Sequence, residues 1–229
     1  MPYYGFDVYY LILVLPAFLI SLVAGIKVKT TFAKYSSVFV GVSGAEAARR
    51  VLYAAGVTNV QIERVSGNLT DHYDPKSNVI RLSEKVYGAN TVSAVGVACH
   101  EAGHAIQYAV GYAPIKLRAA IIPACQFGSN FSWIALFIGL IFNFEKLVIA
   151  GIVLFSLVVV FQLVTLPVEF NASRRAIAAI RENGILEGRE LSGAKRVLTA
   201  AAMTYVAALL ISLAQFLRLI LLFGRRNNR

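Results

Sequence analysis

Long apolar runs constrain the fold of this chain more than any other feature of its sequence. Residues 7–26 are almost wholly apolar, and comparable runs lie at about 121–142, 147–166 and 197–223. A helix needs about 20 apolar residues to cross the hydrocarbon core of a bilayer. Hydrophobic residues make up 58% of the chain and charged residues 15%, whereas soluble domains are about 45–50% apolar and about 25% charged. The sequence therefore predicts a mainly α, polytopic membrane protein in contact with the lipid bilayer.

The positions of the basic residues predict how the chain crosses the membrane. The start, MPYYGFDVYY, has no Lys or Arg, so residues 1–26 are expected to be a retained membrane anchor and not a signal peptide. Three lysines follow this run closely, and positive residues beside a span mark its cytoplasmic end. On that topology, segments 27–120 and 167–196 are cytoplasmic and hold 17 of the 22 Lys and Arg residues. Because these charges flank apolar runs, no nucleic-acid partner is expected, although the net charge is +10.

Segment 27–120 is predicted to be a small α+β insert that ends in a long helix. Ser43 and the glutamate three residues later have the spacing of a capping box, which indicates a short helix after this serine. Alternating residues over Val57–Val65 predict one strand, and residues 78–83 predict a second. A long helix is expected over 91–110, with a threonine as its cap.

The remainder of the chain is predicted to form a transmembrane hairpin over 121–166, a cytoplasmic helix in 167–196, and a last membrane helix with a basic tail in 197–229. Pro167 marks the exit of the hairpin from the membrane. Arg218 lies inside the last helix, so it must reach the interface or find a partner. Because a full span would place the basic tail outside, this helix could instead lie partly in the interface.

The sequence ACHEAGHAIQ contains the motif HExxH inside the helix expected over 91–110. On a helix, His100 and His104 project from one face, where two neutral imidazoles can bind one zinc ion. Glu101 would then lie beside the activated water and could take its proton. A buried His-Glu-His group without a metal would need several hydrogen-bond partners. The motif therefore predicts a zinc-dependent hydrolase with Glu101 as its general base.

A catalytic zinc site needs a third protein ligand. Glu169, in LPVEFNASRRA, follows the hairpin on the same side of the membrane as the motif. Its carboxylate could instead form a surface ion pair with Arg174 or Arg175. His72 is the remaining histidine, and it lies in a polar turn. We favour Glu169 as the third ligand, because a His-Glu-His group needs an acidic partner nearby.

Four segments, in order along the chain, resemble one known family. The run TDHYDPKSNVIRLSEKVYG, then HEAGHAIQ, LPVEFNASRRA and VLTAAAMTYVAA, is similar to the YugP-like neutral zinc metallopeptidases of bacterial membranes. The chain is more distantly similar to the HtpX and prenyl-protein-peptidase group, but Ser173 stands where that group has Asp. The resemblance implies a bacterial cell-membrane protein with a zincin-like catalytic insert. It also implies His100, His104 and Glu169 as zinc ligands and Glu101 as the base.

Several other residues are weaker candidates for roles in catalysis. Those that could stabilise the oxyanion of a tetrahedral intermediate, or support the zinc ligands, are His72, Ser173, Arg174 and Tyr205. A predicted strand could bind an extended peptide substrate along its edge, and it consists of Asn78, Val79, Ile80, Arg81 and Leu82. The same strand could simply pair with Val57–Val65 and cover the core.

Three functions remain open from the sequence. The first is a gluzincin-like peptidase that acts on peptides or membrane proteins at the cytoplasmic membrane face. The second, a site-2-type intramembrane protease, would take its third ligand from an Asp in a later span, but residues 121–166 contain no Asp. The third, a non-enzymatic membrane scaffold with a metal site, would need no base, whereas Glu101 is present. The sequence thus favours the peptidase, and it specifies neither the substrate nor any protein partner.

Overall fold

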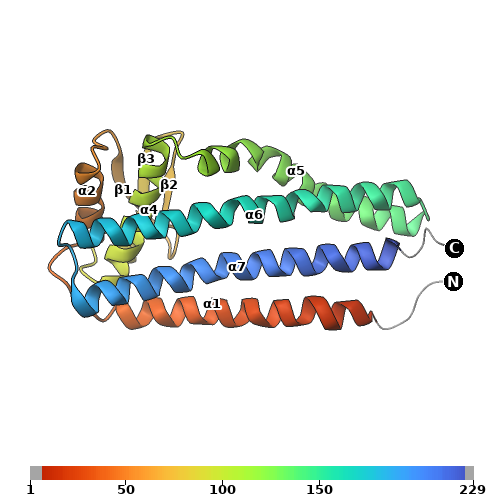
Figure 1. Ribbon diagram of the computed structural model, residues 1–229, viewed down its shortest axis with the longest axis horizontal. Helices are drawn as coiled ribbons and strands as arrows, with labels where there is room; N and C mark the ends of the chain where they lie inside the picture. Colours follow the sequence, from red (N-terminus) through yellow and green to blue (C-terminus); the bar gives the residue numbers. More distant parts are fainter. Residues whose placement is uncertain (1–6, 225–229) are drawn as a thin grey trace. The chain divides into compact units, whose positions relative to one another are not determined.

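The structure, a computed structural model, describes residues 7–224 of the chain, which form two compact units. Among the described residues, the first unit comprises 7–24, 117–166 and 204–224, and the second comprises 25–116 and 167–203. In chain order (Figure 1), the elements are the π-helix η1 (Tyr10–Val14), α1 (Leu15–Tyr35), α2 (Gly44–Ala54), β1 (Gln61–Val65), β2 (His72–Asp74), β3 (Val79–Ser83), α3 (Glu84–Tyr87), α4 (Val92–Ala109), α5 (Ala113–Ile141), α6 (Glu145–Glu182) and α7 (Gly188–Gly224).

Within residues 7–224, four helices are long and apolar enough to cross a membrane. They cover Tyr10–Tyr35, Ala113–Ile141, Glu145–Glu182 and Gly188–Phe223. The prediction of a mainly α protein with several apolar spans is therefore confirmed. Each helix is longer than the apolar run that predicted it, because a helix need not end where its sequence stops being apolar.

The helix α6 continues through Pro167, where the sequence indicated only the exit of a span. Proline removes one backbone hydrogen bond, and helices of membrane proteins tolerate this because neighbouring groups satisfy the freed carbonyl. Glu169 therefore lies on the same helix as the second arm of the hairpin, and not on a separate cytoplasmic helix. The helix ends at Glu182, before Gly184, whose φ of +59° suits a residue without a side chain.

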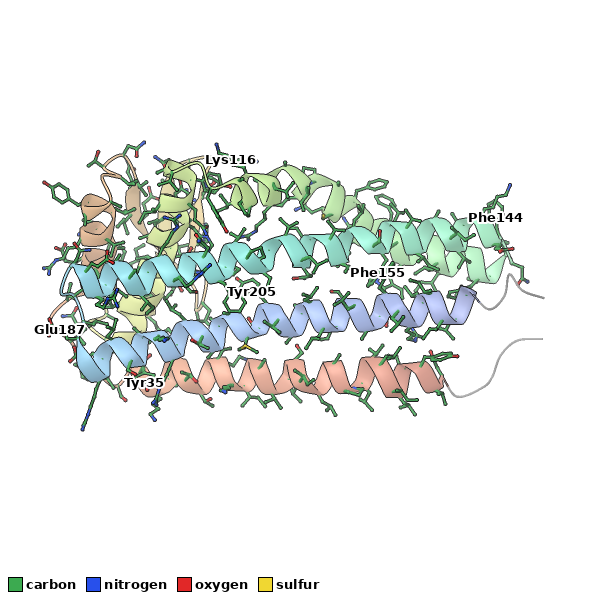
Figure 2. All side chains as sticks on the ribbon, in the orientation of Figure 1. Tyr35, Lys116, Phe144, Phe155, Glu187 and Tyr205 are labelled. Atoms are coloured by element: carbon green, nitrogen blue, oxygen red, sulfur yellow. The ribbon has the colours of Figure 1, made fainter. Side chains whose placement is uncertain are left out.

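In the first unit, α5 and α6 pack as an antiparallel hairpin (Figure 1). Phe144 lies at the turn, and Phe155 lies farther along α6 (Figure 2). The helices approach closely at Gly151, where a Cβ would lie 3.0 Å from the backbone nitrogen of Leu136. The ring of Trp133 meets Phe155 edge-on, with 5.9 Å between centroids. Small residues at the contact are typical of helices that associate in lipid, where van der Waals packing must hold them together.

Arg218 finds a partner within the same unit. Its guanidinium donates to Asp7 Oδ2 through Nε, at 2.7 Å, and through Nη2. It also lies over the ring of Tyr10, at 5.4 Å from the centroid. Asp7 precedes the first helix and Arg218 lies near the end of the last helix, so the ion pair joins the beginning of one helix to the end of the other. Whether the last helix spans the membrane or lies partly in the interface stays a prediction.

The helix α4 lies at the centre of the second unit. Thr91 caps it as predicted, because its hydroxyl accepts from the backbone N–H of Ala94 at 3.3 Å. Cys99 is fully buried, and burial raises the pKa of its thiol. The core around α4 includes buried residues from α2, β3, α6 and α7, among them Ala47, Ile80, Ile180 and Ala194.

Three strands form a sheet in the order β1-β3-β2 (Figure 1). The strand β3 pairs in parallel with β1, with Gln61 opposite Val79. The strand β1 covers the second half of Val57–Val65, where alternation predicted a strand. The strand β3 also pairs antiparallel with β2, a short strand among turn residues that the sequence did not predict. Because β3 is the central strand, both of its edges are occupied. The hypothesis of an open substrate-binding edge is therefore wrong for Val79, Ile80 and Arg81, which pair on both sides. Leu82 pairs only with β1 and Asn78 precedes the strand, so their part in substrate binding stays a prediction, and the outer edges of the sheet belong to β1 and β2.

Candidate metal centre

The motif residues lie together on α4 because a spacing of four residues is about one helical turn. The rings of His100 and His104 are 4.7 Å apart between centroids and nearly perpendicular, at 81°. Glu101 and His104 are each only 8% exposed. The helix thus buries its polar centre, and buried charged groups need partners of opposite charge or a metal ion.

The helix α6 supplies the carboxylate of Glu169 to this centre. Its Oε2 lies 3.3 Å from His100 Nε2 and 3.6 Å from His104 Nε2. Glu169 is 2% exposed, which is rare for a carboxylate. Among the described residues, His100, His104 and Glu169 form a group whose donor atoms all lie within 4.8 Å of one another. The three side chains that the sequence analysis selected as ligands are therefore brought together.

The two distances from Glu169 fit a tetrahedral zinc ion. Ligand atoms at about 2.0–2.2 Å from such an ion lie about 3.3–3.6 Å apart, the range found between Glu169 and the two histidines. Two imidazole nitrogens and one carboxylate oxygen are a common donor set for catalytic zinc, and they leave one coordination position open. The residues present thus fit the metal.

Close contact between α4 and α6 makes this arrangement possible. At Gly103, an added Cβ would lie 2.7 Å from the carbonyl oxygen of Ala172, so the two backbones meet where a side chain has no room. Gly103 lies between the two histidines, and Ala172 lies one turn after Glu169. The glycine of the motif therefore sets how near the third donor comes to the first two.

The other ring nitrogen of each histidine also has a partner. Ser173 Oγ lies 3.2 Å from His100 Nδ1, so this residue contacts a candidate ligand. His104 Nδ1 lies 3.0 Å from Gln107 Oε1. Gln107 was not among the residues predicted for the site, although its spacing of three residues from His104 places it on the same helical face.

The charge state of His104 reflects its surroundings. Burial opposes the charged form of the ring, but the neighbouring carboxylates of Glu169 and Glu101 outweigh this effect. The pKa of His104 is therefore raised above its ordinary value of 6.5. Because zinc binds the neutral ring, a proton competes with the metal for His104 more strongly than it would for an ordinary histidine.

The remaining candidates are placed differently. His72 is exposed on β2, and its Nδ1 lies 2.8 Å from the carbonyl oxygen of Thr70. Arg174 is exposed on α6. Tyr205 lies on α7 and belongs to the first unit, whereas the motif belongs to the second. Participation of these three residues in catalysis stays a prediction.

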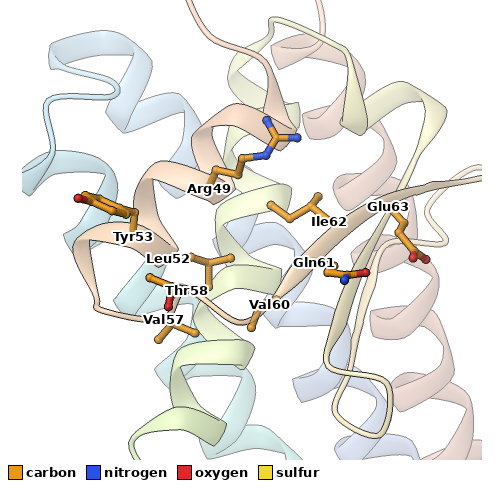
Figure 3. A pocket seen from close by; sticks show the side chains of 9 residues that line it. All are labelled: Arg49, Leu52, Tyr53, Val57, Thr58, Val60, Gln61, Ile62 and Glu63. Atoms are coloured by element: carbon orange, nitrogen blue, oxygen red, sulfur yellow. The ribbon is translucent and has the colours of Figure 1, made fainter.

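A pocket of about 510 Å³ lies between α2 and β1 (Figure 3). Its lining includes Arg49, Tyr53 and Ile62, and none of the three candidate ligands. The pocket therefore does not belong to the metal centre.

Comparison with known proteins agrees with the chemistry of this centre. A family model described as "Putative neutral zinc metallopeptidase" matches residues 10–224. The chain is 45% identical over 223 residues to the "Putative membrane protease YugP" of Bacillus subtilis (strain 168). The aligned residues cover 96% of this chain and 99% of that protein. No solved structure matches the chain. The predicted resemblance and the prediction of zinc as cofactor are thus confirmed, and the chain belongs to the neutral zinc metallopeptidase family that this model describes.

Proposed function

We propose that this protein hydrolyses peptide bonds at the cytoplasmic face of a bacterial cell membrane, with zinc held by His100, His104 and Glu169. One observation carries the proposal. Donor atoms from two helices, far apart in the sequence, lie within 4.8 Å of one another, with His104 and Glu169 buried and His100 half-buried. Such convergence of two histidines and a carboxylate is costly without a metal, because each group must be removed from water.

Glu101 is the general base in this proposal. When bound, zinc supplies a Lewis acid that polarises the scissile carbonyl and makes water a nucleophile near neutral pH. Glu101 follows His100 directly, and it is nearly buried, so its carboxylate can take a proton from a water held at the same centre. It can then deliver that proton to the amine that leaves.

The arrangement supports a gluzincin-like class and a zincin-like catalytic part. The two histidines are four residues apart on a helix, and the candidate third ligand is a glutamate from a later helix. A small sheet in the same unit contributes to the core beside the motif helix. The open edges of β1 and β2 are available for an extended peptide, which main-chain hydrogen bonds could hold without a strict sequence requirement.

The cytoplasmic location rests on charge. Segments 27–120 and 167–196 carry 17 of the 22 Lys and Arg residues, and they include the motif and Glu169. Positive residues beside membrane spans are retained on the cytoplasmic side. Substrates would therefore be cytoplasmic peptides or the cytoplasmic segments of membrane proteins.

The substitution Glu101→Gln tests this function. We expect one zinc per chain to be retained by elemental analysis, because the proposed ligands are intact. Hydrolysis of a mixture of fluorogenic peptides should fall by about 10²–10⁴-fold, because an amide cannot accept the proton of water. The control, Glu187→Gln, changes an exposed carboxylate in the same unit and should leave both quantities unchanged. Undiminished hydrolysis by Glu101→Gln would exclude Glu101 as the base.

The ligands are tested by zinc content. The double variant His100→Ala with His104→Ala should lose its zinc, and Glu169→Ala should bind zinc more weakly than the wild type. Full zinc content in the double variant would contradict the proposed site, whatever the variants do to hydrolysis.

A further inference from the structure

Gln107 is a fully buried amide, three residues after His104 on α4. Its Oε1 lies 3.0 Å from His104 Nδ1. Its Nε2 donates to the backbone carbonyl of Val168 at 2.9 Å and to Asn171 Oδ1 at 3.0 Å. An apolar side chain of similar size could fill this place without any polar group to desolvate, so the paired amide suggests a role beyond packing.

The partners of this amide determine which way it points. A backbone carbonyl can only accept, so the group facing Val168 must be the Gln107 nitrogen. The guanidinium of Arg175 can only donate, and its Nε donates to Asn171 Oδ1 at 2.8 Å. This fixes the Asn171 oxygen as an acceptor, and it agrees with the same assignment for Gln107. The Gln107 oxygen therefore faces His104.

The orientation of the amide in turn fixes the imidazole. Because the Gln107 oxygen can only accept, His104 Nδ1 must carry the proton. The lone pair of the neutral ring then lies on Nε2, the nitrogen that faces Glu169. A zinc ligand of this kind needs that tautomer, and its other nitrogen is usually held by a hydrogen bond of this sort. Ser173 exerts no equivalent control on His100, because a hydroxyl can either donate or accept.

The same amide also locates the third candidate ligand. Val168 precedes Glu169 directly, and Asn171 follows it by two residues, so the two acceptors of Gln107 lie on either side of this carboxylate along α6. We infer that Gln107 is a positioning residue that fixes the tautomer of His104 and holds the part of α6 that carries Glu169 beside this histidine. This inference rests on the proposed function, since it assigns a purpose to the same metal centre.

Two substitutions separate this role from simple packing. Gln107→Met keeps the volume but removes every hydrogen bond, and it should weaken zinc binding by about 10–100-fold in chelator competition. Gln107→Glu keeps an acceptor for His104 Nδ1 but loses the donor to Val168 and Asn171, so it should bind zinc more tightly than the Met variant and more weakly than the wild type. The control is Ser93→Ala, which removes the hydrogen bond of 2.8 Å from a buried α4 hydroxyl to Ser36, and it should leave zinc affinity unchanged.

A measurement on the unaltered side chain keeps the inference testable even if Gln107→Met fails to fold. In metal-free protein labelled with ¹⁵N-histidine, at a pH above the raised pKa of His104, NMR should show the Nδ1–H tautomer for this ring. The signals of His104 are identified by their loss in His104→Asn. An Nε2–H tautomer in the otherwise wild-type protein would overturn the inference, as would wild-type zinc affinity in a folded Gln107→Met variant. Equal losses in the Met and Glu variants would also overturn it, because the acceptor for His104 Nδ1 would then contribute nothing to zinc binding.

Failure of the proposed function has a different signature. If the double histidine variant keeps its zinc, the metal lies elsewhere, while the tautomer of His104 in the metal-free protein is unaffected by that result. If the histidines are needed for zinc and Gln107→Met binds it as tightly as the wild type, only the inference on Gln107 fails.

Discussion

Replacing Gly103 with Ala should damage the metal centre more than it damages the fold. The added Cβ would lie 2.7 Å from the Ala172 carbonyl oxygen, whereas ordinary contacts begin at 3.4 Å. Because the obstructing atom belongs to the backbone, the two helices must separate by up to 0.7 Å, the difference between these distances. The distances of 3.3 and 3.6 Å from Glu169 to the two histidines would then open by up to the same 0.7 Å, to about 4.0 and 4.3 Å. Both values exceed the about 3.3–3.6 Å that tetrahedral zinc allows.

The two expected effects differ in size. Overpacking costs about 1–3 kcal/mol, but alanine is better than glycine in a helix by about 1 kcal/mol. The net loss of stability should therefore be about 0–2 kcal/mol. A misplacement approaching 1 Å at a catalytic centre lowers activity by about 10²-fold. We thus expect a folded protein with weakened zinc binding and peptide hydrolysis reduced by up to about two orders of magnitude.

Gly96→Ala is the matched control for this change. It lies on the same helix, but its Cβ would meet Ala194 Cβ at 3.6 Å, an ordinary contact that requires no movement. Thermal unfolding, chelator competition for zinc and peptide hydrolysis should be measured on both variants. Wild-type zinc affinity in Gly103→Ala, or equal damage in the two variants, would refute the idea that this contact sets the donor distances.

Three further results are expected. Because the pKa of His104 is raised above 6.5, protonation of this ring stabilises the metal-free fold. This contribution is fully present at a pH below that ordinary pKa and is lost as the pH rises through the raised pKa. Zinc affinity should change in the opposite direction, falling by up to about tenfold per pH unit as the pH drops through that pKa. Across a pH series, unfolding in EDTA measures the stability of the metal-free fold, and chelator competition measures the zinc affinity. Arg218→Met should lower stability in detergent by about 1–3 kcal/mol, because it leaves partly buried Asp7 without its ion pair. The double exchange Asp7→Arg with Arg218→Asp should recover much of this loss in the same unfolding assay, and no recovery would count against a direct pair. In a background without Cys99 and Cys125, Lys76→Cys should resist an impermeant thiol reagent in intact cells and react after permeabilisation, whereas labelling of intact cells would reverse the proposed topology.

The local features of the fold were predictable because each depends on neighbouring residues. Thr91 predicted the start of α4, since a threonine before an apolar helix can cap it. The long apolar runs predicted the helices that are candidate membrane spans. The order of the sheet was not predictable, because alternation reveals a strand but not how many partners it has. The strand β2 at His72–Asp74 was therefore not predicted, and β3 was predicted to have an open edge although it is the central strand of the sheet.

The same distinction explains why the metal centre could be predicted only in part. His100 and His104 follow from helical periodicity alone, so no knowledge of tertiary structure is needed to place them on one face. The position of Glu169 depends on where α4 and α6 meet, and no local pattern encodes that crossing. Gln107 is intermediate, because periodicity places it near His104 but its partners on α6 are visible only in the folded chain. A buried polar residue three or four positions from a candidate ligand is therefore worth testing before its partners are known, since its burial requires partners and the nearest polar group is the ligand itself.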